Sequence, residues 1–311
     1  MPAPCPTTTP MSPRSAASPP WRLSTSRTAS RPMPENKIDL AADVATMSPT
    51  TNEIVTAAIA REIRDGDLAF VGVGTNGRAF TLAVGIPLTA VRLAQMLHAP
   101  SASVYWGNLL EPDLSSMPAD LKQDSFTRWQ AAACPSDTGV KCDMLARRAF
   151  DVCFDSAAQI DRFGNLNITA IGDYRNPKVR LVGCLAQPEH FAFVPRPIVV
   201  VDLDRRVFVE AVDFITSVGH LRGGRSREEA GLSSGGPQLV VTDKAIFDFE
   251  PGSRQMRLRS LHPGVTAEEV FDLMSFRPVL PEQLPATPLP SMQELDLIRR
   301  VIDPNRVLLR V

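Results

Sequence analysis

The residues best suited to chemistry are scattered along the sequence. The four histidines, at positions 98, 190, 220 and 262, neither pair at i, i+4 nor form HExxH, and no GxSxG elbow stands between a strand and a helix. The five cysteines form no CxxC pair and no cluster with zinc-ligand spacing, so we predict reduced thiols and no metal site. Each histidine is therefore expected to be structural.

A glycine motif follows the first predicted strand. Gly72, Gly74 and Gly77 match GxGxxG, a spacing typical of dinucleotide-binding turns. However, no Asp or Glu lies between Arg78 and Leu110 to bind a ribose, and the next helix is predicted to start only at Pro87. A loop that lets some other ligand approach the backbone is favoured over a nicotinamide or flavin site.

The most distinctive polar run is residues 159–167. Its Asp161-x-x-Gly164 is good turn chemistry, because Asp can bond its own backbone and Gly can take positive φ. A tight turn between two buried strands is one interpretation. The other places Gln159 and Asn167 beside a ligand at the C-terminal edge of the sheet.

Helices and strands alternate through the first half of the chain. Thr50 and Glu53 form a capping box before a helix that Gly66 ends, and Pro87 opens another helix. The strands are apolar on both faces, which predicts an α/β fold with a mostly parallel sheet. The predicted strands are Leu68–Val73, Ser101–Tyr105, Val152–Ala157, Ile198–Asp202, Val207–Val209 and Leu239–Thr242.

The two ends differ from the middle. Residues 1–34 hold nine Pro, six Ser and five Thr, so we expect residues 1–49 to be a disordered extension. A transit peptide, or a start codon assigned too early with Met33 or Met47 the true start, are the alternatives. Residues 51–311 are expected to form one domain. In its last part, residues 277–290 carry five prolines and should form an extended strap before a helix capped by Ser291 and Glu294.

Composition excludes several classes of protein. A net charge of -1 and a pI near 6.4 offer no basic face for nucleic acid. No run of about 18 apolar residues is present, so no membrane span is predicted. A cytoplasmic protein is the expectation.

Several stretches, in this order, resemble the β subunit of class I coenzyme A transferases of the glutaconate CoA-transferase type. The resemblance covers roughly residues 51–308 and implies a three-layer α/β/α sandwich with an open sheet. The stretches are Val84–Pro87, His98–Pro100, Gln159–Asn167, Ile171–Tyr174, Pro177–Lys178, Arg206–Asp213, Thr216–Ser217, Gly235–Gln238, Val241–Asp243, His262–Thr266, Leu297–Arg299 and Ile302–Pro304.

The resemblance also implies a partner and a substrate. Such β subunits work beside a homologous α subunit, as αβ or α2β2, with the active site at their interface. The substrate is an acyl-CoA thioester, so coenzyme A enters with the substrate and no cofactor is bound permanently. In the transferases, a β-subunit glutamate attacks the thioester and forms covalent intermediates.

This sequence departs from the transferase pattern twice. The position expected to hold the glutamate is Gly107, and Glu111 is the candidate substitute. The Gly-x-Gly-Gly loop that holds an oxyanion reads Gly183-Cys184-Leu185-Ala186-Gln187. The resemblance and the spacing together give these candidate substrate-binding residues: Gly85, Asn108, Gln159, Asn167, Gly183, Cys184 and Gln187.

Three functions stay open at this stage. The same glutamate is absent from the β subunit of the steroid ring-opening CoA hydrolases, which the C-terminal half resembles and whose key glutamate lies on the α subunit. The first hypothesis is such a hydrolase, with backbone amides near Gly107 and Gly183 steadying the oxyanion. The second is a true transferase that uses Glu111. The third is a non-catalytic structural partner of an active α subunit.

Overall fold

The computed structural model describes residues 48–310, apart from Thr75, Ser116 and residues 118–130, 134–137 and 233–234. All of them belong to one compact unit, Ala41–Val311. The extension predicted over residues 1–49 lies almost wholly outside the described residues.

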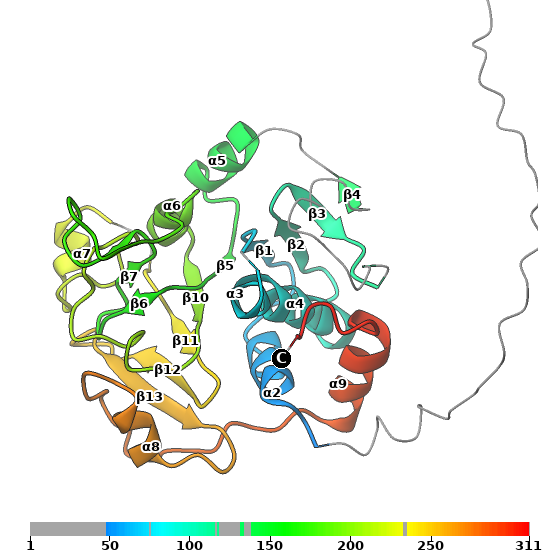
Figure 1. Cartoon of the computed structure of the whole chain (residues 1–311). Helices are drawn as coiled ribbons and strands as arrows, with labels where there is room; N and C mark the ends of the chain where they lie inside the picture. Colours follow the sequence, from blue (N-terminus) through cyan, green and yellow to red (C-terminus); the bar gives the residue numbers. More distant parts are fainter. Residues whose placement is uncertain are drawn as a thin grey trace, which may run out of the picture. The chain divides into compact units, whose positions relative to one another are not determined.

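A nine-stranded sheet organises this unit (Figure 1). Five central strands, in the order β11-β10-β5-β1-β2, run parallel, as the apolar strand pattern predicts. Two antiparallel strands extend each edge, so the whole sheet is mixed. The strands are β1 (Leu68–Val71), β2 (Ser103–Trp106), β3 (Leu109–Pro112), β4 (Ala131–Ala133), β5 (Val152–Asp155), β10 (Arg196–Val200), β11 (Leu239–Val241), β12 (Ala245–Phe249) and β13 (Met256–Leu261).

Side chains alternate between two faces of the central strands, which gives the predicted layers. On β1, Ala69 and Val71 face a core shared with the helices α2, α4 and η3. Phe70 faces the opposite core, which includes Leu145 of α5. The helices are α2 (Thr51–Ala60), α3 (Arg78–Phe80), η1 (Thr81–Gly85), α4 (Ile86–Leu97), α5 (Thr138–Ala146), α6 (Gln187–Phe193), α7 (Ser226–Glu229), α8 (Ala267–Asp272), α9 (Met292–Asp296) and η3 (Leu297–Ile302).

Two small antiparallel pairs lie outside the main sheet. The strands β6 (Gln159–Ile160) and β7 (Leu166–Asn167) flank the Asp161 turn. There the Asp161 carboxylate accepts hydrogen bonds from the amides of Phe163 and Asn165, and Gly164 has φ +69°. The tight-turn interpretation is therefore confirmed. The second pair is β8 (Ala170–Ile171) and β9 (Val179–Arg180).

The C-terminal residues 277–290 contain no helix and run along β13. Backbone hydrogen bonds join Val279 to Met256 and Leu258, and join Leu261 to Pro285 and Thr287. A proline-rich segment can run along β13 because this strand is at the edge of the sheet. The prolines there have no N–H to donate, and no further strand requires one.

Two sequence-based expectations are wrong. Val207–Val209 is not a strand, because only Phe208 pairs, as an isolated bridge to Ile160. The second helix does not begin at Pro87 but at Arg78, and it runs through a π-helical turn, Thr81–Gly85, before α4. Pro87 lacks an N–H, and the wider turn before it accommodates this gap in the helical ladder.

The continuous helix Arg78–Leu97 is long and apolar enough to cross a membrane. However, 67% of its apolar window is buried inside the fold. The length and composition of this helix are therefore weak evidence for a membrane span, since the core helix of a folded domain can have both.

We expect acid to destabilise the fold through His220. Burial lowers the pKa of His220 to about 4, although the Pro237 carbonyl accepts a hydrogen bond from its ring. Below pH 6.5 the unfolded chain takes up a proton that the folded chain refuses until about pH 4, so stability falls with pH across that window. The loss from this residue should approach about 3 kcal/mol. Denaturant unfolding from pH 7 to 4 should show a shallower loss for His220→Gln, and equal slopes would contradict the assignment.

Candidate active site

A cavity of about 730 Å³ opens where the central parallel strands end. Its walls include Gly72 to Gly74 after β1, Gly107 after β2 and Asp155 to Ala158 at the end of β5. The loop of residues 181–187 closes another side. The carboxyl ends of parallel strands are the usual place for a ligand in such folds.

Gly72 and Gly74 of the glycine motif line this cavity, and so do four residues that the family resemblance singled out: Gly107, Gly183, Cys184 and Gln187. Two backbone amide groups are already used, since Gly107 donates to Val71 and Gly183 donates to Ile168. These two amides therefore cannot also donate to an oxyanion, and the candidate donors are amides further along the loop. The backbone N–H groups of Cys184, Leu185 and Ala186 have no hydrogen-bond acceptor in the described part of the chain.

Gln187 is held firmly in the cavity wall. Its side-chain amide donates to the Ser156 carbonyl at 2.8 Å and accepts from the Ser217 hydroxyl at 2.9 Å. It joins the end of β5 to the loop, and this fixes the cavity shape.

The other candidates do not line the cavity. The amide of Asn167 donates to Gln159 at 2.7 Å, and Gln159 in turn bonds Asp213. These two side chains lie outside the cavity, next in sequence to its lining residues Ala158 and Ile168. Asn108 lies in the turn between β2 and β3.

Gly85 has a packing role instead. A Cβ added there would lie 1.8 Å from the carbonyl oxygen of Leu308. The glycine therefore lets the helix that contains it approach the C-terminal segment closely.

Glu111 is held on β3 and is not part of the cavity wall. Its Oε1 accepts from the backbone amide of Val104 at 2.6 Å and from the Gln95 side chain at 3.0 Å. These bonds tie the carboxylate to the neighbouring strand and to α4.

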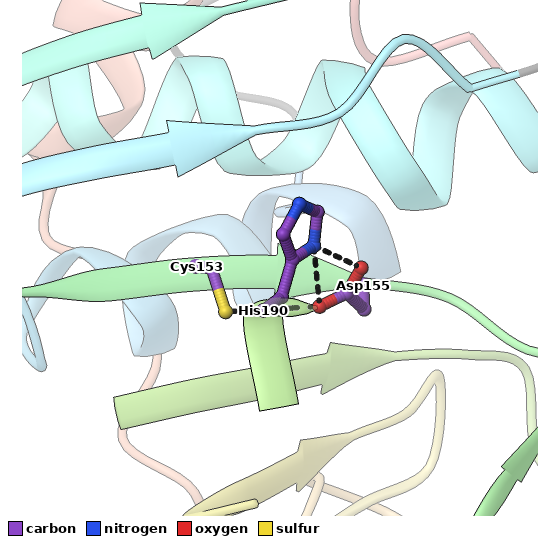
Figure 2. Close-up of side chains that lie close together, drawn as sticks. All are labelled: Cys153, Asp155 and His190. Carbon is purple, nitrogen blue, oxygen red and sulfur yellow. Dashed lines mark hydrogen bonds and ion pairs between the residues drawn. The ribbon is translucent and has the colours of Figure 1, made fainter. Parts of the chain in front are cut away.

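The sequence analysis did not select a buried polar pair that lines this cavity. His190 on α6 and Asp155 at the end of β5 both line it. The Nδ1 of His190 lies 3.0 Å from Oδ1 of Asp155, and the thiol of Cys153 donates to Oδ2 at 3.7 Å (Figure 2). The His190 and Asp155 side chains are only 5% and 6% exposed.

Lys141 on α5 also lines the cavity and was not foreseen. It is 3% exposed, and its Nζ lies 5.9 Å from the centre of the Phe70 ring. Burial lowers the pKa of this amine. No hydrogen bond or ion pair reaches it from the described residues, so a positive charge on this amine has no acidic partner there.

Cys153, Asp155 and His190 offer donor atoms within 4.8 Å of one another, which raises the question of a metal. Burial and the neighbouring Asp155 raise the pKa of the Cys153 thiol well above its usual range. In addition, the unpartnered ring nitrogen of His190 is Nε2, which lies on the side away from the other two groups (Figure 2). The geometry favours a hydrogen-bonded group over a metal centre.

Comparison with known proteins identifies the family. The chain is 34% identical over 251 residues to the B subunit of 3-oxoadipate CoA-transferase from Pseudomonas knackmussii, covering 80% of this chain and 92% of that protein. The chain belongs to the coenzyme A transferase family. The family model for coenzyme A transferase matches residues 141–273, a range that includes Lys141, Asp155 and His190.

Two further relatives of this coenzyme A transferase family member complete the comparison. The chain is 30% identical over 227 residues to the cholesterol ring-cleaving hydrolase IpdB subunit of Rhodococcus jostii, covering 71% of this chain and 83% of that one. The crystal structure of glutaconate coenzyme A-transferase from Acidaminococcus fermentans superposes with a TM-score of 0.72 at 27% identity, covering 85% and 98% of the two chains. The predicted α/β fold and the predicted family are both confirmed.

Proposed function

We propose that this chain is the β subunit of a hydrolase complex whose substrate is an acyl-CoA thioester and whose reaction is of the ring-opening kind. The observation that carries the proposal is Gly107. It lies in the cavity at the position where the transferases are expected to hold their nucleophilic glutamate. The one carboxylate among the described cavity residues, Asp155, is engaged by His190 and Cys153. Water is the nucleophile that we assign to the reaction.

The proposed reaction adds water to a carbonyl of the acyl group. In a cyclic β-keto thioester, the water oxygen bonds to the ring ketone carbon. The bond from that carbon to the thioester α-carbon then breaks, and the α-carbon takes a proton. Oxygen bears negative charge during this addition, and preorganised donors stabilise it. The amides of Cys184, Leu185 and Ala186 and the buried Lys141 ammonium are the donors that we assign to this task.

A homologous α subunit is the proposed partner, and coenzyme A is proposed to enter with the substrate. Apolar side chains stand exposed beside the cavity. Val182 is 78% exposed and Leu185 is 70% exposed, and both line the cavity. Exposed apolar residues around a site are expected where a second protein covers them. The relatives named as subunits support the same interpretation.

Product analysis tests hydrolysis against transfer. The chain is co-expressed with its candidate α subunit, and the complex is incubated with 2-oxocyclohexane-1-carbonyl-CoA or glutaryl-CoA, with and without acetate or succinate. Mass spectrometry then separates three products: an acyl-CoA that has gained water, a free acid with free CoA, and a new acyl-CoA of the acceptor. We expect water addition that ignores the added carboxylate. A new acyl-CoA that requires the acceptor would contradict the proposal.

Glu111 offers a direct test of the transferase alternative. The variant Glu111→Gln keeps an oxygen that can accept from Val104, so the fold should survive. Because the side chain lies outside the cavity, we expect kcat/KM within about threefold of wild type, a change under 1 kcal/mol. Loss of all turnover in a correctly assembled Glu111→Gln complex would instead favour transfer through this residue.

The structural-partner alternative predicts a different pattern. If the α subunit did all the chemistry, changes at Asn108, Gly183 and Gln187 would affect assembly and leave turnover intact. Our proposal expects changes at the cavity residues Gly183 and Gln187 to lower turnover in assembled complexes, while Asn108, outside the cavity, serves as the comparison.

A further inference from the structure

His190 differs from the other three histidines in its hydrogen bonding. Both ring nitrogens of His262 are bonded, at 3.0 Å to Thr287 and 2.8 Å to the Thr242 carbonyl. His98 and His220 each bond a backbone carbonyl through Nε2. The Nε2 of His190 is buried and has no partner among the described residues.

An unpartnered buried nitrogen is costly, so its retention needs a reason. Among the four histidines, only His190 has a buried ring nitrogen without a partner in the described part of the chain. His190 lines the cavity, and Asp155 holds it through Nδ1 at 3.0 Å. An Nδ1–H donated to a carboxylate leaves Nε2 as the bare acceptor. Because His190 lines the cavity, a molecule that enters it is the partner that we assign to the buried Nε2.

We propose that His190 is a general base that this subunit supplies to the hydrolysis, with Asp155 as its positioning residue. This inference rests on the proposed function. Nε2 takes a proton from water as the water oxygen bonds to the carbonyl carbon. When the carbon–carbon or carbon–sulfur bond breaks, its electron pair goes to the leaving carbon or sulfur. The proton then passes from Nε2 to that atom, which restores neutral His190.

The surroundings suit this role. The Phe70 ring lies 4.5 Å from the imidazole, centre to centre, and excludes water from one side. The titratable groups around His190 are Asp155 and Cys153 on β5, Lys141 on α5, Cys184 on the cavity loop and Tyr105, which stacks on Phe70. Lys141 lines the same cavity, where we assign it to the developing oxyanion.

The test compares His190→Gln, Asp155→Asn and Cys153→Ala in the co-expressed complex, using the water-addition assay with 2-oxocyclohexane-1-carbonyl-CoA and glutaryl-CoA. We expect His190→Gln to lower kcat about 100-fold or more with little change in KM. Asp155→Asn should also lower kcat, because an amide that donates to Nδ1 forces the proton onto Nε2. The acid limb of the wild-type pH–rate profile should vanish in His190→Gln, and added imidazole should restore turnover to His190→Ala.

Cys153→Ala is the matched control, since Cys153 touches Asp155 but does not line the cavity. We expect its kcat within about threefold of wild type. Loss of activity in Cys153→Ala, together with bound zinc in the purified complex, would show a metal centre and overturn the proposal. A His190→Gln complex that turns over as fast as the wild-type complex would also overturn it.

If the wild-type complex adds water to neither probe, the proposed function fails, which is a separate result. Should His190→Gln not assemble, Asp155→Asn and Cys153→Ala decide between base and metal.

Discussion

Gly85→Ala is expected to destabilise the protein by about 3 kcal/mol or more, at the upper end for overpacking. The added methyl would lie 1.8 Å from the Leu308 carbonyl oxygen and 2.7 Å from its carbon. Both are backbone atoms, so no side chain can rotate away. The amides of Val307, Leu308 and Leu309 all donate to the Asp303 carboxylate, which holds this segment in place. The helix and the C-terminal segment must therefore separate.

Denaturant unfolding of both variants measures the effect. Gly72→Ala is the control, because a Cβ there meets nothing within 4 Å. We expect its loss to stay under about 1 kcal/mol. If Gly85→Ala were equally mild and instead raised KM for the acyl-CoA, Gly85 would be the substrate-binding residue suggested by its sequence motif, and its packing assignment would be wrong.

Arg299→Met is expected to cost about 3–5 kcal/mol, because it leaves a buried carboxylate without its cation. Arg299 on η3 contacts Glu53 on α2 at 2.6 Å, and the side chains are only 10% and 8% exposed. Burial alone would raise the pKa of Glu53, but the hydrogen bonds and charge of Arg299, with the Thr50 bonds, lower it. The pair joins the first and last helices of the described chain.

A double variant separates lost charge from lost packing. Glu53→Gln with Arg299→Met removes both charges, and the amide oxygen can still accept from the Thr50 backbone, as the Glu53 carboxylate does at 2.7 Å. We expect the double variant to regain part of the loss. Arg300→Met is the exposed comparison, since its pair with Asp296 is 45% and 53% exposed, and should cost under about 1 kcal/mol. A double variant less stable than Arg299→Met would contradict the account.

Local sequence signals predict the elements of this fold well. The predicted capping boxes at Thr50 and Ser291 both form, because both hydrogen bonds of each box join residues three apart. Val207–Val209 fails for the opposite reason. Its apolar residues suit a strand, but no sheet edge reaches them beyond one bridge at Phe208.

The site was predicted only in part. Gly107, Gly183 and Gln187 were found through their resemblance to family motifs, and they do line the cavity. His190 and Asp155 were missed because they are 35 residues apart, and no sequence spacing links a helix residue to a distant strand end. One signal was available, since Asp155 is the one charged residue of the predicted strand Val152–Ala157. A buried charge at a strand end is a reason to suspect a site.

The most direct test of the central claim is the intact mass of this subunit during turnover. The complex is incubated with acyl-CoA in water enriched in ¹⁸O, without an acceptor carboxylate, in a sample shown to be active. The account predicts ¹⁸O in the product and an unchanged mass for this chain. A subunit that gains the mass of coenzyme A, with the adduct on a glutamate such as Glu111, would contradict it and make this chain a transferase.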